Sequence, residues 1–322
     1  MSESLGNAMF VNSETVGDYL TVSVPQDDTK KAVSPEEFQI HYLEAGIGEP
    51  LILIHSLGQS LYTWRNVFGE LSENYRVIAI DLPGHGYSSR PDTLNYTADE
   101  MADILNQFME KKGIQSAHMI GFSIGAMYLL RFLSIYPEKV ANCIVISPGG
   151  VTEQMPKLIH KIASPMVSVF ARNLYSSGDV RNLLQECVAD SSLITSNVVS
   201  QYYEPISDGL SREALMYALR NLNMDQIAEG LIPVDHEILV LWGKEDRWHL
   251  PSDSIYFQGI LQSGRYYLIR NAGHLLQEEA YSKLLEIIQS YIPVAGEKVS
   301  TSSETVSGFY QMEEDPLEEP VD

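Results

Sequence analysis

One short stretch of this sequence has residue types and spacing suited to covalent chemistry. Residues 121–125 read Gly-Phe-Ser-Ile-Gly, which matches the pattern G-x-S-x-G, between an apolar run and an apolar helical pattern. A strand-to-helix turn this sharp brings backbones together and strains its central residue, so the flanking positions require glycine. Such a turn would present the Ser123 hydroxyl as a nucleophile beside the amide of Ile124. By itself the pentapeptide is a weak signal, because a serine in an ordinary tight loop also matches it.

Two further residues stand where a serine nucleophile needs them. A serine hydroxyl reacts poorly at neutral pH unless a base lies within hydrogen-bond reach and an acid orients that base. Asp246 and His274 each follow an apolar, strand-like run, as Ser123 does. Three such matches predict a catalytic triad of Ser123, His274 and Asp246 far more strongly than one match would. Glu245 and Asp235 lie nearby and remain alternative acids.

The other histidines have more ordinary interpretations. His55 and His85 lie in Gly-containing loops, which we expect them to hold by hydrogen bonds. The remaining histidines have no spacing that suggests a metal site: His41, His118, His160, His236 and His249. The sequence therefore predicts neither a metal ion nor a cofactor.

The elements that must position these residues alternate between strand-like and helical patterns. Short runs that are apolar on both faces recur along the chain, as expected for central strands covered by helices: 50–58, 76–86, 117–125, 141–150, 237–246 and 265–274. Between two of these runs, a helical pattern begins at the N-cap Thr97, has Glu100 three residues on, and ends at Gly113. This alternation predicts an α/β protein with a mostly parallel, doubly wound sheet. Reactive loops are then expected at the carboxyl ends of the strands.

The spacing of these patterns also divides the chain into parts. Residues 36–150 and 235–292 carry the alternation and form the predicted core, after a partly irregular N-terminal segment, 1–35, with one β-like piece. Residues 151–234 contain only helical patterns, which predicts a helical cap inserted into the core. Residues 293–322 end in ten positions with six acidic and no basic side chains, which predicts a solvated, disordered tail.

Composition limits the class of protein. With 322 residues, 44% of them hydrophobic, the chain can bury a large core. Its formal charge of -22 argues against nucleic acid or an anionic membrane as the main partner. No apolar stretch approaches the roughly 18 residues of a membrane span, and the N-terminus has no secretory signal pattern. Cys143 and Cys187 are interpreted as buried thiols, and a cytoplasmic location is expected.

On these motifs, the chain resembles the α/β-hydrolase superfamily. The likeness covers the predicted core and is carried by DLPGHGYSS (81–89), LVLWGKEDRWHLP (239–251) and NAGHLLQEEA (271–280). The order Ser, Asp, His along the chain is that of the superfamily's triad. The helical insertion resembles the cap of its epoxide hydrolase, haloalkane dehalogenase and carbon-carbon hydrolase branches.

The resemblance implies an oxyanion hole and a reaction class. Its members take one amide from the residue after the nucleophile, here Ile124, and another from the loop after the third strand, here Leu57. Ser56 replaces the usual glycine of that loop, and its hydroxyl either binds substrate or faces solvent. A serine nucleophile implies an acyl-enzyme. Dehalogenase and epoxide hydrolase activities are therefore disfavoured, because those enzymes of this fold attack with an aspartate.

The predicted function is hydrolysis of a small or medium acyl ester or thioester, without a cofactor, in a pocket roofed by the cap. The alternatives that stay open are carbon-carbon bond hydrolysis, acyl transfer on the same triad, and a small-molecule receptor or interaction protein without turnover. Trp64 and Trp248 lie near the reactive loops and either touch substrate or pack. The expected partner is a small-molecule acyl substrate, and the oligomeric state is left open.

Overall fold

A single sheet of mostly parallel strands organises the molecule. The computed structural model describes residues 17–24, 36–149, 176–207, 209–231 and 234–294, and the backbone of 313–314. The strand order is β1-β2-β4-β3-β5-β6-β7-β8-β9. β1 (Asp18–Ser23) and β2 (Glu37–Ala45) pair antiparallel, β2 pairs antiparallel with β4, and the remaining neighbours are parallel. The predicted doubly wound α/β fold is confirmed.

The parallel strands are short and apolar because helices cover both faces of the sheet. They are β3 (Pro50–Ile54), β4 (Arg76–Ile80), β5 (Ala117–Phe122), β6 (Val140–Ile146), β7 (Ile238–Gly243) and β8 (Gly264–Ile269). The edge strand β9 (Glu313–Glu314) is also parallel to its neighbour but consists of two glutamates. Every residue of β5 and β7 is buried. In β5, Met119 belongs to one hydrophobic cluster and Ile120 to the other, because successive side chains of a strand point to opposite faces.

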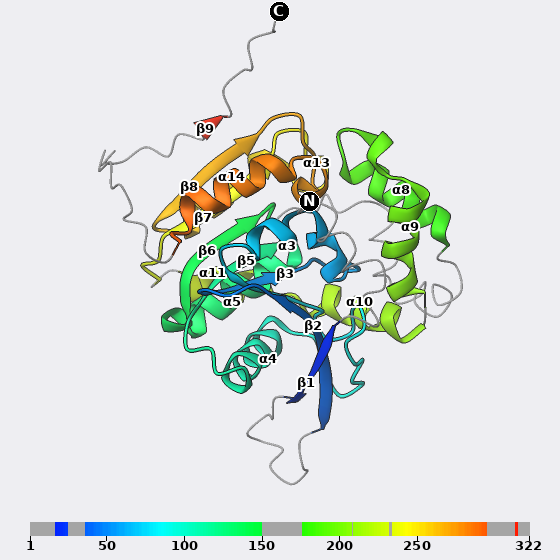
Figure 1. Ribbon diagram of the computed structural model, residues 1–322, viewed down its shortest axis with the longest axis vertical. Helices are drawn as coiled ribbons and strands as arrows, with labels where there is room; N and C mark the ends of the chain where they lie inside the picture. The colour runs from blue at the N-terminus through cyan, green and yellow to red at the C-terminus, as the bar shows by residue number, and fades with distance from the viewer. Residues whose placement is uncertain are drawn as a thin grey trace, which may run out of the picture.

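Each face of the sheet has its own set of helices (Figure 1). One cluster includes residues of α4 (Ala98–Lys111), α5 (Ile124–Ile135), α11 (Met224–Leu231) and α12 (Ser254–Ile260). The other includes residues of the 3-10 helix η2 (Leu61–Trp64), α3 (Arg65–Leu71), α13 (Leu276–Glu279) and α14 (Tyr281–Tyr291). α4 begins with the predicted capping box, in which Thr97 and Glu100 bond reciprocally.

The described part of the insertion between β6 and β7 is helical, as predicted. It contains α8 (Ser177–Cys187), α9 (Ser196–Tyr203), α10 (Gly209–Asn221) and α11, with short 3-10 turns η4 (Ser191–Leu193) and η5 (Glu204–Ile206). Figure 1 shows α8 and α9 at the right of the view, whereas α11 returns to lie beside α5. Residues 151–175, 208, 232 and 233 of the predicted cap lie outside the described residues.

The N-terminal strand and the C-terminal tail meet opposite edges of the sheet. β1 is the β-like piece expected in the N-terminal segment, and it pairs with β2 along its full length. At the other edge, Glu313 and Glu314 pair with Tyr267 and Leu268 of β8. The rest of the tail after residue 294 lies outside the described residues, so its disorder stays a prediction.

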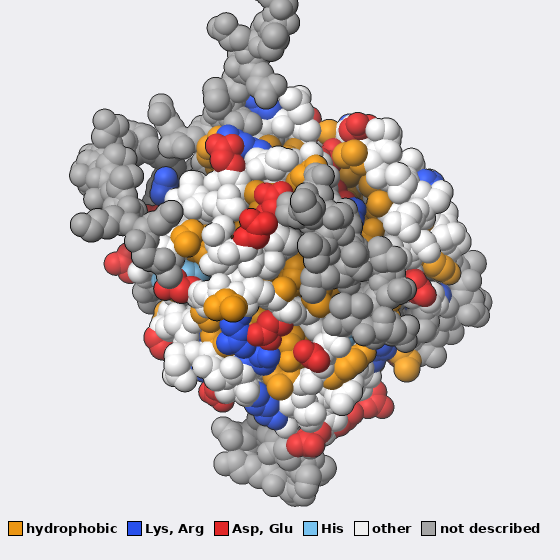
Figure 2. All heavy atoms as spheres, in the orientation of Figure 1, with side chains coloured by type: hydrophobic (Ala, Val, Ile, Leu, Met, Phe, Trp, Pro, Cys, Tyr) orange, Lys and Arg blue, Asp and Glu red, His pale blue; other side chains and the backbone are white. Residues whose placement is uncertain are grey.

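Charges on the described surface are mixed. Figure 2 shows acidic and basic side chains next to one another on this face. Glu44, for example, lies 2.5 Å from both Arg76 and Lys112. Within the ranges given above, every helix is too short or too polar to traverse a lipid bilayer.

The burial of an apolar side chain should determine how much its truncation lowers the free energy of unfolding. Phe132 of α5 is completely buried, whereas Ile255 of α12 is 70% exposed. Phe132→Ala is expected to lower the free energy of unfolding by about 3–5 kcal/mol, because it opens a cavity in the core. Ile255→Ala is expected to change it by less than about 0.5 kcal/mol. Urea denaturation of both variants measures the difference, and equal losses would contradict this account.

Candidate active site

Ser123 occupies the sharp turn between β5 and α5. Its φ of 53° and ψ of -117° lie in a region that non-glycine residues rarely adopt. The Ser123 N–H donates to the Ile146 carbonyl at 2.9 Å, which ties the turn to the neighbouring strand β6. The surrounding structure thus holds Ser123 in a strained conformation at the carboxyl end of a central strand.

The two glycines of the motif are required by close backbone contacts. A Cβ on Gly121 would lie 2.7 Å from Cα of Ala126 in α5. A Cβ on Gly125 would lie 2.2 Å from the carbonyl oxygen of His55. The second contact places the loop after β3 against the first turn of α5. The structure therefore brings the loop that carries Leu57 to the helix turn that carries Ile124.

His274 and Asp246 form a buried pair. Nδ1 of His274 lies 2.8 Å from Oδ2 of Asp246, and the two residues are 3% and 2% exposed. Burial opposes ionisation of Asp246, but His274 and hydrogen bonds outweigh it and hold the pKa of this carboxyl below its ordinary value. Because a carboxylate only accepts, Nδ1 carries the proton and donates it. Nε2 of the neutral ring then carries the lone pair that a general base needs.

The second oxygen of Asp246 is held by backbone amides. The N–H groups of Trp248 and His249 donate to Oδ1 at 2.8 and 3.0 Å. Each carboxylate oxygen thus has its own partners, and the carboxylate cannot rotate without losing them. The alternative acids are engaged elsewhere: Glu245 accepts the N–H of Ala272 at 3.0 Å, and Asp235 lies 3.3 Å from the Ser263 hydroxyl.

Three aromatic rings surround the His274 imidazole. Phe122, which precedes Ser123, has its ring centroid 4.9 Å away, so His274 lies at the same end of β5 as Ser123. The Trp248 ring stacks on the imidazole at 5.8 Å, and the His249 ring meets it edge-on at 4.7 Å. Burial and the neighbouring His274 lower the pKa of His249 to about 4, so His249 is uncharged at neutral pH.

The two tryptophans near the reactive loops have different positions. Trp64 is completely buried, so it packs in the core. Trp248 is half-buried and lies against the base. Ser56 is 5% exposed, which is inconsistent with a solvent-facing hydroxyl.

Hydrogen bonds of His55 fix the start of the loop after β3, which carries Leu57. Its Nε2 accepts the N–H of Leu82 at 2.9 Å, and its Nδ1 lies 2.7 Å from the Ser56 carbonyl. Since an amide only donates and a carbonyl only accepts, the ring is neutral with its proton on Nδ1. Burial lowers the pKa of His55, in agreement with a neutral ring. His85 donates similarly from Nδ1 to Pro83 O at 2.9 Å, so both histidines have the structural role expected from the sequence.

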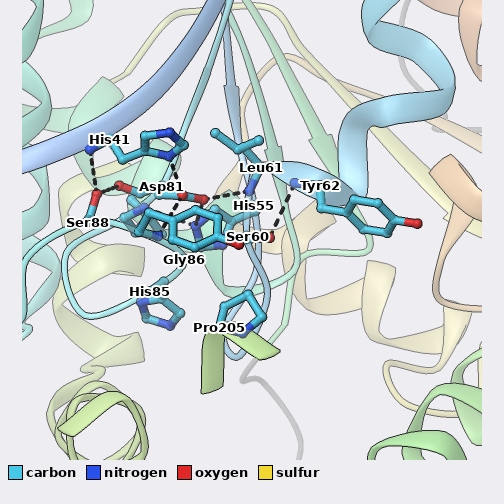
Figure 3. Close-up of polar contacts among 12 residues, drawn as sticks. His41, His55, Ser60, Leu61, Tyr62, Asp81, His85, Gly86, Ser88 and Pro205 are labelled. Atoms are coloured by element: carbon cyan, nitrogen blue, oxygen red, sulfur yellow. Dashed lines mark hydrogen bonds and ion pairs between the residues drawn. The ribbon is translucent and has the colours of Figure 1, made fainter. Parts of the chain in front are cut away.

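Asp81, which the sequence reasoning did not single out, fixes the far end of the same loop (Figure 3). Its Oδ1 accepts the N–H of Leu61 at 2.7 Å, where η2 begins. Its Oδ2 lies 2.7 Å from Nδ1 of His41 and accepts the N–H of Tyr87 at 3.0 Å. Burial opposes ionisation, but the His41 hydrogen bond and charge keep the pKa of Asp81 below its ordinary value. An aspartate directly after β4, opening DLPGHG, is the available sequence signal.

A buried polar group joins the insertion to the core, and we call Arg65, Glu278 and Tyr202 the cap anchor. Arg65 forms two hydrogen bonds with the Glu278 carboxylate, at 2.6 and 2.5 Å. The Tyr202 hydroxyl of α9 lies 2.7 Å from Glu278 Oε1 and 3.0 Å from the Thr63 hydroxyl. Burial and Glu278 raise the pKa of Tyr202, so the hydroxyl keeps its proton and donates to Glu278. The anchor links α9 to η2, α3 and α13.

Among the described residues, no group of three or more His, Cys, Asp or Glu side chains is arranged to hold a metal ion. Cys143 and Cys187 are buried and free, as predicted. The absence of a cofactor stays a prediction from the sequence.

The buried histidines should make stability fall in acid. Burial and the neighbouring His55 lower the pKa of His85 from 6.5 to about 3. The unfolded chain therefore takes up a proton near pH 6.5 that the folded chain does not, and the free energy of unfolding decreases as pH falls from 6.5 towards 3. In His85→Gln this part of the decrease is expected to be lost, as measured by urea denaturation between pH 7 and pH 4.5. Identical pH slopes for wild type and variant would refute the assignment.

Comparisons with known proteins agree with this geometry. Residues 49–175 match a family model described as the alpha/beta hydrolase fold. The chain is 26% identical to the uncharacterized hydrolase YugF of Bacillus subtilis (strain 168) over 253 residues, which cover 78% of this chain and 92% of that protein. It is also 26% identical to 2-hydroxymuconate semialdehyde hydrolase of Pseudomonas sp. (strain CF600) over 261 residues, 78% of this chain and 89% of that protein.

Solved structures show the same likeness. A variant of the meta-cleavage product hydrolase CumD superimposes with a TM-score of 0.68 at 25% identity, covering 78% of this chain and 93% of that one. A thermophilic esterase from Thermogutta terrifontis has a TM-score of 0.69 at 20% identity, covering 85% and 97%, which shows a shared fold. The chain therefore has the α/β-hydrolase fold, and it is similar to hydrolases of that fold over most of its length.

Proposed function

We propose that this chain is a serine hydrolase that cleaves small or medium acyl esters or thioesters through an acyl-enzyme. The observation that carries the proposal is the buried His274–Asp246 hydrogen bond of 2.8 Å, at the same end of β5 as the strained Ser123. An imidazole with its proton held on Nδ1 and its lone pair on Nε2 is prepared to accept the proton of a serine hydroxyl.

The first half of the reaction forms the acyl-enzyme. Oγ of Ser123 attacks the substrate carbonyl carbon while its proton passes to Nε2 of His274. The carbonyl oxygen becomes an oxyanion, and the N–H groups of Leu57 and Ile124 donate to it. The bond to the leaving alcohol or thiol then breaks, and His274 returns the proton to that leaving group.

The second half releases the acid. His274 takes a proton from water as the water oxygen attacks the acyl carbon, and it returns the proton to Ser123 Oγ when the acyl bond breaks. Asp246 stays ionised throughout and stabilises the imidazolium of each step. The aromatic rings around His274 limit water near the base, which strengthens these electrostatic interactions.

Carbon-carbon bond hydrolysis is the second candidate function. It is favoured by relatives such as 2-hydroxymuconate semialdehyde hydrolase, which align over most of this chain. The same triad would cleave an activated diketone if the leaving group were a stabilised carbanion instead of an alcohol or thiol. Acyl transfer differs only in the acceptor that attacks the acyl-enzyme.

Replacement of the nucleophile is the direct test. Ser123→Ala is expected to lower hydrolysis of p-nitrophenyl butyrate by about 10³-fold or more, because no oxygen remains to form the acyl-enzyme. The matched control is Ser147→Ala at the end of the neighbouring strand, which also has a positive φ, of 42°, and whose buried hydroxyl has no hydrogen-bond partner among the described residues. Ser147→Ala is expected to keep its activity within about twofold.

Labelling by a fluorophosphonate probe gives a second test of the Ser123→Ala and Ser147→Ala variants. It is expected to label the wild type and Ser147→Ala but not Ser123→Ala. Full activity of Ser123→Ala would refute the serine mechanism, and a labelled wild type without turnover on any ester, thioester or diketone would favour a receptor. A higher kcat/KM for a 2-hydroxy-6-oxo-dienoate than for each ester and thioester would favour the second candidate.

Substituting the adjacent carboxylates Asp246 and Glu245 in turn tests which of them is the acid of the proposed triad. Asp246→Asn is expected to lower kcat by about 10²–10⁴-fold, because an amide cannot hold the imidazole with its proton on Nδ1 as a carboxylate does. Glu245→Gln, which changes a contact with the loop backbone only, is expected to cost much less. Steady-state kinetics on p-nitrophenyl butyrate measure both, and a larger loss for Glu245→Gln would reassign the acid.

A further inference from the structure

The short loop that carries His274 is held by acceptors from other parts of the chain. The Ala272 N–H donates to Glu245 Oε2 at 3.0 Å, and the Gly273 N–H donates to Glu279 Oε2 at 2.5 Å. The His274 N–H donates to the carbonyl of Cys187 at 2.6 Å. The three consecutive amides of residues 272–274 thus each donate a hydrogen bond. The acceptor of the His274 amide, the Cys187 carbonyl, belongs to the insertion. The backbone position of the base therefore depends on where the insertion lies.

Glu279 strengthens the same connection from the core side. Its Oε1 accepts the N–H groups of Ala189 and Asp190, at 2.6 and 2.9 Å, while its Oε2 holds Gly273. One carboxylate therefore bridges the segment after α8 and the residue before the catalytic histidine. We call residues 187–190, Gly273, His274 and Glu279 the cap clip.

The contact within the cap clip is close and specific. A Cβ on Gly273 would lie 2.5 Å from the Cys187 carbonyl oxygen and 3.0 Å from the Ala189 nitrogen. No side chain fits between the two segments, so they meet backbone to backbone. Burial raises the pKa of Glu279, and the amide donors from Asp190, Gly273 and Ala189 act in the opposite direction. The polar contacts of this half-buried side chain are thus made to amides of the two segments it joins.

We propose that Glu279 is a positioning residue, which orients His274 by seating residues 187–190 of the insertion on the catalytic loop. The proposal rests on the proposed function, in which His274 activates Ser123. In this view the insertion contributes to catalysis through the base itself, in addition to any part it has in enclosing substrate. The catalytic arrangement is complete only when this segment is seated.

The contribution of a general base to a rate depends on how precisely the base is placed. Proton transfer by a positioned side chain contributes about 10²–10⁴-fold to a rate, and a misplacement of about 1 Å can cost 10²-fold. The Asp246 contact fixes one ring atom of His274, but the backbone amide must also be held to fix the ring's position. Loss of the cap clip should therefore slow the chemical step and leave binding of a small substrate largely unchanged.

The test uses a reagent that is small enough not to need an enclosed pocket. Diisopropyl fluorophosphate phosphorylates an activated serine, with fluoride leaving and the serine proton passing to the base. In Glu279→Gln, an amide nitrogen faces backbone N–H donors in place of an oxygen. We expect its second-order labelling rate at Ser123 to be about tenfold to a hundredfold below that of the wild type. We expect kcat for p-nitrophenyl acetate to fall similarly, with KM within about threefold.

Tyr202→Phe is the matched control for a loosened insertion. It removes the hydroxyl of the cap anchor, a second contact between insertion and core, and leaves the hydrogen bonds of residues 272–274 intact. Its labelling rate is expected to stay within about twofold of the wild type. Glu279→Asp keeps the negative charge but shortens the side chain. Slow labelling of this variant as well would show that the contact of the carboxylate with both segments matters, and not its charge alone.

The outcomes separate this inference from the proposed function. Labelling of both Glu279 variants at the wild-type rate would overturn the inference, as would equal slowing in Tyr202→Phe. A wild type that the reagent does not label at Ser123 would overturn the proposed function instead. Near-UV circular dichroism establishes that each variant is folded, and if Glu279→Gln is not, the rate of Glu279→Asp decides.

Discussion

The hydrogen bond between His274 and Asp246 is the interaction on which the proposed chemistry of this protein depends. A buried carboxylate is costly unless each of its oxygens has partners. Here one oxygen takes the imidazole proton and the other takes two backbone amides. This arrangement keeps Asp246 charged, fixes the tautomer of His274 and leaves one ring nitrogen free to act as a base. The strained turn presents Ser123 at the same end of β5, where the proposed mechanism needs this ring nitrogen to accept the serine proton.

The parallel sheet is what makes this pair possible. Ser123, Asp246 and His274 follow β5, β7 and β8, whose carboxyl ends share one edge of the sheet. Apolar helices on both faces keep the strands in register, and glycines allow the loops to approach one another. A Cβ on Gly243, for example, would lie 2.0 Å from the carbonyl of Gly273. Core packing and catalytic geometry are therefore set by the same contacts.

Buried and half-buried carboxylates outside the proposed triad connect segments that are far apart in the sequence. Asp81 holds the far end of the loop after β3, Glu278 joins α9 to the core, and Glu279 joins the segment after α8 to the loop that carries His274. Each accepts hydrogen bonds from groups far away in the sequence, so each constrains the relative position of elements that local propensity cannot place. The low dielectric of their surroundings makes these bonds strong and makes an unpaired partner costly.

The sequence by itself determined the fold class, because buried parallel strands and amphipathic helices have distinct apolar patterns that need no knowledge of distant contacts. It also determined Ser123 as a candidate nucleophile, because only glycines suit the turn that G-x-S-x-G makes. The choice of Asp246 over Glu245 as the partner of His274 was decided by the tertiary structure, since adjacent residues look alike in a sequence but point in different directions.

The roles of Asp81 and Glu279 were also decided only by the tertiary structure. Glu279 meets Ala189 across 90 positions and Asp81 meets His41 across 40, distances over which side-chain type gives no information about partners. Ser56, for which a solvent-facing hydroxyl was one interpretation, is buried in the folded chain. Local patterns set which elements form, whereas long-range packing sets which polar groups meet, because hydrogen-bond geometry exists only after the elements have packed.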